Sequence, residues 1–151
     1  MNPPAPELTE SLGKRSAGRA LDLACGTGRH AVWLRDRGWA VTAVDLAVEE
    51  LDCITCVRAD LERGQFPIEP AVWDLIVCWL YWQEDLLPQI ANGVRPDGVV
   101  ALAGKLTGRF ATSLERYRQA FAGWEEISAG EDAYKAFFVA TRPGGTGFSR
   151  L

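Results

Sequence analysis

The chain has 151 residues, the length of one ordinary domain. Its 16 basic and 20 acidic side chains give a formal net charge of −4, and its arginines are dispersed, so no basic stripe can follow a nucleic-acid backbone. No apolar run approaches the ~18 residues of a membrane span, and residues 1–7 lack the basic flank and apolar core of a signal peptide. We therefore expect a cytoplasmic monomer or homodimer without nucleic-acid or membrane partners.

Four cysteines are present, and two of them, Cys53 and Cys56, have Cys-x-x-Cys spacing. This spacing is compatible with a redox pair or with half of a zinc site. A structural zinc site needs four ligands, and neither a second pair nor a nearby histidine accompanies these two. We predict no metal site and free thiols in a reducing compartment.

The first residues are rich in proline, which predicts an extended and poorly ordered arm before a short helix over residues 7–15. We assign residues 1–19 to this arm and helix. A single domain is expected over residues 20–143, and a loose tail over residues 144–151.

Apolar runs and helical spacings alternate along the rest of the chain. Strands are predicted over residues 20–25, 39–44, 53–58, 73–79, 99–103, 124–129 and 133–141, and helices over residues 28–37, 84–94 and 113–121. Alternating strands and helices indicate βαβ units and a parallel sheet, whereas the last two strands are close enough only for an antiparallel hairpin. The expected fold class is α/β: a Rossmann-like, doubly wound, mostly parallel sheet with one antiparallel strand, in three α/β/α layers.

Two connections have distinctive lengths or residues. Residues 46–52 are too few for the dozen or more that a parallel crossover normally takes, so we predict an irregular or single-turn connection and a thinly covered third strand. Residues 95–98, Arg-Pro-Asp-Gly, predict a tight turn before the fifth strand.

The central stretch of the sequence is residues 20–31, an apolar strand followed by Gly26-Thr27-Gly28 and a helix start. The glycines allow a sharp turn and a close approach to a ligand, and the helix start supplies free N–H groups with partial positive charge. The spacing Gly26-x-Gly28-x-x-Ala31 also satisfies the loose fingerprint of dinucleotide-binding proteins.

Three acids at strand ends separate the possible ligands. Asp22, inside the first strand, repels a diphosphate but suits an ammonium or sulfonium group. Asp45 stands where a ribose-binding acid is expected, and Asp60 can accept a hydrogen bond from an adenine amino group. Each acid alone can be only a cap or a turn residue, but a ligand that fits all three is S-adenosylmethionine. A nicotinamide dinucleotide is the remaining alternative.

Residues 21–30, Leu-Asp-Leu-Ala-Cys-Gly-Thr-Gly-Arg-His, resemble the first motif of class I S-adenosylmethionine-dependent methyltransferases. Val44-Asp45, Ala59-Asp60-Leu61 and residues 73–77 and 94–98 look like the later motifs. The compact chain is most similar to the small bacterial, tellurite-resistance-like group. The resemblance implies S-adenosylmethionine as cofactor, a small-molecule acceptor and the strand order 3-2-1-4-5-7-6.

The strand ends and the resemblance together predict the site. The cofactor-binding residues are expected to be Asp22, Ala24, Cys25, Gly26, Thr27, Gly28, Asp45, Leu46, Asp60, Leu61, Cys78 and Trp79. The candidates on the substrate side are Tyr81, Trp82 and Lys105. Relatives often carry a histidine in the stretch after the fourth strand, which this chain lacks, so no catalytic residue is assigned.

Tyr81 and His30 are conceivable bases, although His30 is expected to pack or to cap its helix. Methyl transfer from an activated cofactor depends chiefly on positioning the two partners. The predicted function is in-line methyl transfer from S-adenosylmethionine to a small molecule. The alternative is a non-catalytic S-adenosylmethionine-binding module that acts through a partner, because nothing before residue 20 is expected to close over a substrate.

Overall fold

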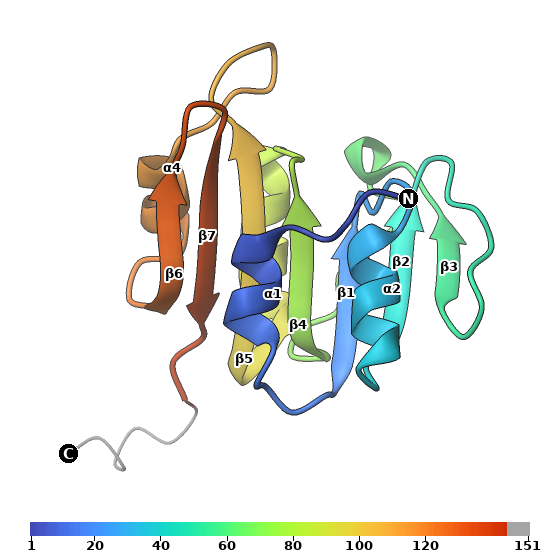
Figure 1. Ribbon diagram of the computed structural model, residues 1–151. Coiled ribbons are helices and arrows are strands. Elements are labelled where there is room, and N and C mark those ends of the chain that lie inside the picture. The colour runs from blue at the N-terminus through green and yellow to red at the C-terminus, as the bar shows by residue number, and fades with distance from the viewer. Residues whose placement is uncertain (145–151) are drawn as a thin grey trace.

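Residues 1–144 are described by the computed structural model, so the predicted tail lies, apart from residue 144, outside the described residues. Seven strands form one sheet in the order β3-β2-β1-β4-β5-β7-β6 (Figure 1). The strands are β1 Arg19–Leu23, β2 Ala40–Asp45, β3 Thr55–Arg58, β4 Trp73–Trp79, β5 Val94–Lys105, β6 Glu125–Glu131 and β7 Lys135–Thr141. Only β7 runs antiparallel to its neighbours. The predicted order and closing hairpin are confirmed.

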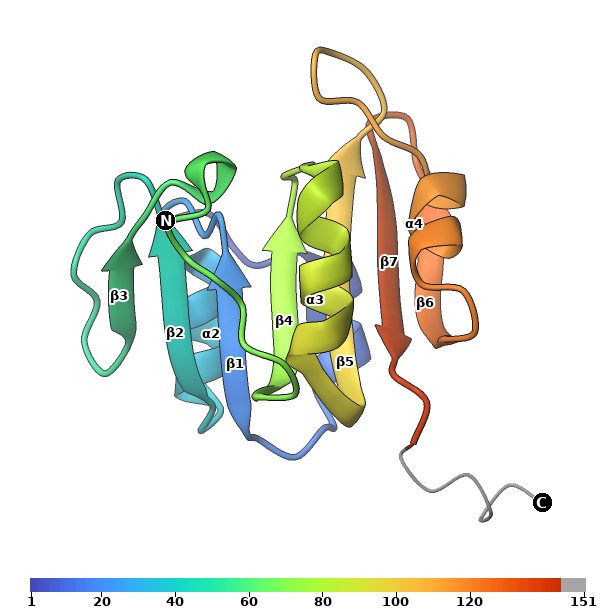
Figure 2. The same ribbon diagram turned by 180° about the vertical axis from the view of Figure 1, so that it is seen from behind.

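Helices cover both faces of the sheet, as the predicted three layers require. The α-helices are α1 Pro6–Leu12, α2 Arg29–Asp36, α3 Leu87–Gly93 and α4 Leu114–Ala120, and the short 3-10 turns are η1 Leu61–Arg63 and η2 Glu84–Leu86. The first two helices lie on one face (Figure 1), and α3 and α4 lie on the other (Figure 2). The predicted helix over residues 84–94 is therefore a 3-10 turn followed by α3.

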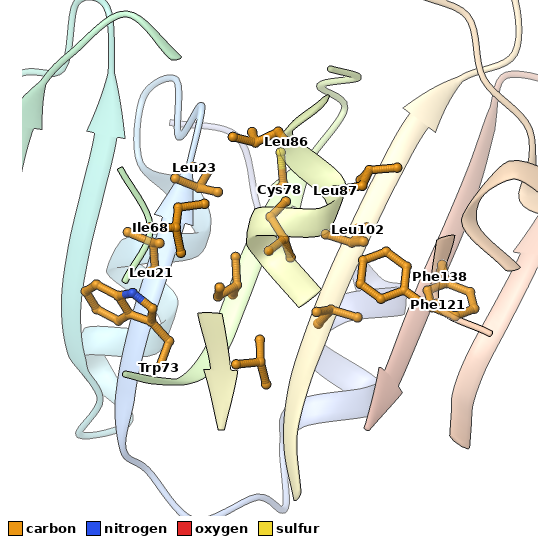
Figure 3. Packing of buried hydrophobic residues seen from close by; sticks show 14 of the residues in the cluster. Leu21, Leu23, Ile68, Trp73, Cys78, Leu86, Leu87, Leu102, Phe121 and Phe138 are labelled. Atoms are coloured by element: carbon orange, nitrogen blue, oxygen red, sulfur yellow. The ribbon is translucent and has the colours of Figure 1, made fainter. Parts of the chain in front are cut away.

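Two apolar clusters form the core, one on each face of the sheet. Leu21 and Leu23 of β1 pack on the side of α3, in the same cluster as Leu86 and Leu87, and Figure 3 shows Leu86 close to Leu23. Ala20 belongs to the cluster on the opposite face. Because successive side chains alternate between two buried faces, the central strands are apolar almost throughout.

The connection between β2 and β3 contains no helix, which confirms the predicted irregular segment. Thr55 is the first residue of β3, two residues later than predicted, because Cys53 adopts a left-handed φ of 60°. No side chain of β3 is fully buried, and no α-helix lies over it in either view (Figures 1 and 2). A short crossover therefore leaves this edge of the sheet thinly covered.

The predicted turn over residues 95–98 is instead an irregularity within β5. Val94 already pairs with Trp73, and the next pair joins Leu75 to Val99, so residues 95–98 bulge out of the ladder. Asp97 has a left-handed φ of 67°, and its N–H donates to the carbonyl oxygen of Arg142 at 3.1 Å. The turn-forming residues therefore bend the chain as predicted, but they do so within β5 and not before it.

Candidate functional site

A strained turn follows β1 and gives the site its shape. Ala24 (φ 53°), Gly26 (φ 59°) and Gly28 (φ 90°) all adopt left-handed conformations, which only glycine tolerates freely. A Cβ at Gly28 would lie 2.5 Å from Cδ1 of Leu51, so a side chain here would require that leucine to move as well as a strained backbone. Gly26 N–H donates to Oδ2 of Asp45 at 2.9 Å. The acid that ends β2 thus holds the glycine turn.

Two cavities meet at Ala24, beyond the C-terminal ends of the central strands. We call the first the Asp22 cavity; its volume is about 290 Å³. Its lining residues are Asn2, Asp22, Ala24, Cys25, Gly26, Thr27, Arg29, His30 and Trp79. We call the second the Asp60 cavity; its volume is about 150 Å³. Its lining residues are Ala24, Asp45, Leu46, Ala59, Asp60, Leu61, Glu62 and Tyr81. Most of the predicted cofactor set is therefore brought together.

Asp22 is the strongest electrostatic feature of the site. Its side chain is 1 % exposed, and its Oδ2 atom has no hydrogen-bond partner among the described residues. Burial raises the pKa of this carboxyl to about 7, against a lowering by the Ala31 amide, and the nearby Asp45 raises it further. A cationic group in the Asp22 cavity would stabilise the charged carboxylate.

The other two acids also have structural partners. Oδ1 of Asp45 accepts from the N–H of Ala47 at 3.2 Å, and Oδ1 of Asp60 accepts from the N–H of Glu62 at 3.0 Å, which caps η1. Both side chains nevertheless line the Asp60 cavity. Capping and ligand binding are therefore compatible here, because each carboxylate has further acceptor positions.

Tyr81 closes one side of the Asp60 cavity. Its hydroxyl donates to Oε1 of Gln83 at 2.7 Å, and the Gln83 amide donates to the carbonyl oxygen of Leu61 at 3.2 Å. Burial, together with the acids around it, raises the pKa of Tyr81 to about 12. Tyr81 is therefore a neutral wall of the cavity near pH 7 and is poorly suited to act as a base.

His30 is also poorly suited to act as a base. Its side chain is buried, and its Nε2 atom accepts from the backbone N–H of Ala5 at 3.1 Å. Burial, and then the neighbouring Arg29, lowers the pKa of His30 to about 4. The ring packs edge-on against Trp79, with centroids 5.7 Å apart. The expectation that His30 packs is confirmed.

Four predicted site residues do not line either cavity: Gly28, Cys78, Trp82 and Lys105. Cys78 faces the core, and its Sγ donates to the carbonyl oxygen of Tyr81 at 3.7 Å. Trp82 lines a different cavity of about 520 Å³ between α3 and α4. Lys105 is exposed at the end of β5.

Five residues that line the two cavities were not predicted from the sequence as cofactor-binding residues: Asn2, Arg29, His30, Ala59 and Glu62. Arg29 and His30 belong to the first motif and to the first turn of α2, and this position directly after the glycine turn could have indicated that they line the site. Asn2 is far away in sequence, and no periodicity or spacing connects it to the site. Only the path of the folded chain brings it there.

Within residues 1–144, no group of three or more histidine, cysteine or acidic side chains is arranged to hold a metal ion. None of the helices in this part of the chain has the length and apolar character that crossing a membrane requires.

Comparison with known proteins supports the interpretation of the motifs. Residues 20–98 match the family described as "Methyltransferase domain". Malonyl-[acyl-carrier protein] O-methyltransferase of Enterobacter lignolyticus (strain SCF1) is 32% identical over 134 residues, which are 81% of this chain and 51% of that protein. The enzyme of that name from Salmonella typhimurium is 33% identical over 135 residues, 82% of this chain and 50% of that protein. The chain thus spans about half the length of these curated relatives.

Solved structures agree in fold. TehB from Haemophilus influenzae superposes with a TM-score of 0.75 at 15% identity, covering 90% of this chain and 61% of that chain. An S-adenosylmethionine-dependent methyltransferase from Mesorhizobium loti has a TM-score of 0.71 at 18% identity, covering 91% and 96%. At these identities the likeness shows the fold alone, so the tellurite-resistance-like grouping stays a prediction. The sequence match, the strand order and the two joined cavities lead to one conclusion: the chain belongs to the methyltransferase-domain family and has the class I fold of S-adenosylmethionine-dependent methyltransferases.

Proposed function

We propose that this protein transfers a methyl group from S-adenosylmethionine to a small-molecule acceptor. The observation that carries the proposal is the buried Asp22 carboxylate, whose Oδ2 atom is unpartnered within the described residues and which lines the Asp22 cavity. An ammonium group satisfies such a carboxylate, whereas a diphosphate would be repelled by it. This favours S-adenosylmethionine over a nicotinamide dinucleotide.

The shape of the site supports the same ligand. In this proposal, the amino-acid end of the cofactor occupies the Asp22 cavity, Asp45 binds the ribose, and the adenine enters the Asp60 cavity beside Leu61 and Tyr81. Ala24, shared by both cavities, lies at the junction. The cofactor supplies an activated methyl group, so the protein's task is to hold the two reactants in line.

On the acceptor side, we propose that the segment after β4 contacts the substrate. Trp82 packs edge-on against Tyr117. The Arg116 guanidinium lies 4.8 Å from the centre of the Trp82 ring. Tyr81 is the neighbour that reaches the Asp60 cavity. Lys105 remains a candidate from the end of β5. The first acceptor to assay is malonyl-[acyl-carrier protein], which is part of the name of the curated relatives.

Calorimetry with S-adenosylhomocysteine tests the cofactor assignment. Asp45→Ala should weaken binding about 10- to 100-fold, because it removes charged acceptors worth roughly 1.5–3 kcal/mol. Asp45→Asn keeps an oxygen for the Gly26 amide and should lose less. The exposed Asp52, whose carboxylate makes no hydrogen bond with any of residues 1–144, gives the control Asp52→Asn. Undiminished binding by Asp45→Ala, or no binding by the wild type at millimolar ligand, would refute the proposal.

A further inference from the structure

Residues 1–5 are extended as predicted, but they do not stand free. They pass from α1 over the C-terminal ends of the central strands to the glycine turn (Figure 1). The carbonyl oxygen of Pro3 accepts from Nη1 of Arg29 at 2.9 Å, and the N–H of Ala5 donates to Nε2 of His30 at 3.1 Å. Both partners belong to the first turn of α2.

The prolines make the second contact specific. Pro3, Pro4 and Pro6 have no backbone N–H, so Ala5 carries the only main-chain donor of residues 3–6. That donor is bound by His30, and the Ala5 side chain is 6 % exposed. The fixed φ of each proline also limits how far the segment can rearrange. Residues 1–5 are therefore held against α2 at a defined place.

The base of the segment is anchored on the far side as well. Leu8 and Leu12 of α1 are buried on the sheet. Nζ of Lys135, the first residue of β7, lies 2.7 Å from Oε2 of Glu7. The segment is thus fixed at α1 and again at α2, and it crosses the space between them.

That space is the mouth of the Asp22 cavity. Asn2 lines this cavity together with Asp22 and Trp79, and Met1 lines an adjoining hollow with Gly26 and Asp45. Asp22 offers a partner for an ammonium group, and Arg29 is the cationic side chain of the same lining. The Asn2 amide adds a neutral hydrogen-bond donor and acceptor at the outer side.

We propose that residues 1–5 form the outer wall of the subsite for the cofactor's amino-acid end, with the Asn2 amide donating to the carboxylate of that end. His30 is a positioning residue: it holds the wall through Ala5 and does not touch the reacting atoms. This inference rests on the proposed function and adds to it a binding residue and its support. It places residues 1–5 at the cofactor's amino-acid end, and the expectation that nothing before residue 20 closes over a substrate stays a prediction.

The test exploits a ligand that lacks the amino-acid end. Dissociation constants for S-adenosylhomocysteine and for adenosine are measured by calorimetry on the full chain. Asn2→Ala should weaken S-adenosylhomocysteine about tenfold, the loss expected for one hydrogen bond to a charged group. Adenosine, which fills only the ribose and adenine positions, should bind as it does to the wild type. Glu10→Gln, at an exposed position of α1, is the matched control and should change neither.

His30 variants test the support. His30→Phe keeps a ring against Trp79 but has no acceptor for the Ala5 amide, so it should lose S-adenosylhomocysteine affinity selectively, as Asn2→Ala does. His30→Gln offers a carbonyl oxygen to the same amide and should recover part of the loss. Circular dichroism and melting temperature show whether each variant folds. If His30→Phe fails to fold, Asn2→Ala, in an exposed residue, still decides the question.

Three results overturn the inference. Equal affinity of Asn2→Ala and wild type for S-adenosylhomocysteine would show that the Asn2 amide does not bind the ligand's carboxylate. Equal losses for S-adenosylhomocysteine and adenosine show a general disturbance rather than a subsite wall. A wild type that binds neither ligand refutes the proposed function together with this inference, which separates that failure from the first two.

Discussion

Asp22 is the only carboxylate among residues 1–144 that is fully buried. Without a ligand, its burial lowers the free energy of unfolding whenever the carboxyl is charged. Its pKa is raised from 3.8 to about 7, chiefly by burial. The folded state therefore holds a proton more tightly than the unfolded state, and the carboxyl destabilises the fold increasingly as pH rises from 3.8 through 7. A residue that opposes folding at neutral pH is typical of a ligand-binding position.

Asp22→Asn should therefore stabilise the ligand-free protein while impairing the cofactor site. At pH 8 we expect the free energy of unfolding to rise by about 1–3 kcal/mol, because a neutral amide replaces a buried charge of similar shape. Binding of S-adenosylhomocysteine should weaken at least about tenfold. Urea unfolding with and without the ligand measures both effects. Asp52→Asn, on the surface, should change neither, and a destabilised, normally binding Asp22→Asn would contradict the expectation.

At the scale of elements, β3 and β6 are the two exposed edge strands of the sheet, and β3 is the shorter. β3 has four residues, none of them fully buried, and among the described strands it pairs only with β2. Few buried apolar contacts mean a low free energy of local opening. By contrast, β4 is buried along most of its length between two neighbouring strands.

Hydrogen exchange should therefore be much faster in β3 than in β4. Peptides covering residues 53–58 should exchange through local opening, whereas those covering residues 73–79 should exchange only with global unfolding. Mass spectrometry under native conditions measures the difference. Saturating S-adenosylhomocysteine should slow exchange at residues 59–62 more than at residues 53–58, because the former line the Asp60 cavity. Equal protection of β3 and β4 would contradict the account.

Several features of the elements could be predicted from the sequence, and others could not. Parallel strands place their C-terminal ends at one edge, so Asp22, Asp45 and Asp60 could be assigned to one site from spacing alone. The missing helix after β2 followed from counting residues. The bulge in β5 did not follow, because it depends on pairing of Val94 with Trp73 across the sheet.

The position of residues 1–5 over the Asp22 cavity could not be predicted from the sequence either. Proline content correctly predicted an extended segment over residues 1–5, but extension does not indicate what the segment packs against. The contact between Ala5 and His30 joins residues 25 positions apart and depends on where α1 lies on the sheet. Such a contact belongs to tertiary structure, and local patterns carry no signal for it.

At the scale of the whole molecule, the two apolar clusters hold the sheet together, and the segments at the C-terminal ends of its central strands line the cavities. The cavity linings come from Asn2, from β1 and the turn after it, from the first turn of α2, from the segment after β3, and from the ends of β2 and β4 with the residues that follow them. The two clusters beneath them fix the strands that carry those segments. Because Asp22 is buried and lines its cavity, a cationic ligand bound there would change the protonation of its carboxyl directly.

This coupling predicts that cofactor binding releases a proton. With a pKa of about 7, Asp22 is about half protonated at pH 7 in the free protein. An ammonium group in the cavity favours the carboxylate, so binding of S-adenosylhomocysteine should expel about half a proton at pH 7. Affinity should rise as pH increases toward 7 and level off above it. His30, whose pKa is lowered to about 4, stays neutral between pH 5.5 and 8 and does not contribute.

Calorimetry in two buffers measures the release directly, because the expelled proton is taken up by the buffer and adds that buffer's ionisation enthalpy. At pH 7 the observed binding enthalpy should differ between phosphate and Tris, and the difference should shrink at pH 8, where Asp22 is mostly charged before binding. Asp22→Asn should bind weakly with no buffer dependence. An identical enthalpy in both buffers for the wild type would mean that the Asp22 carboxyl does not exchange its proton for the cofactor's ammonium group.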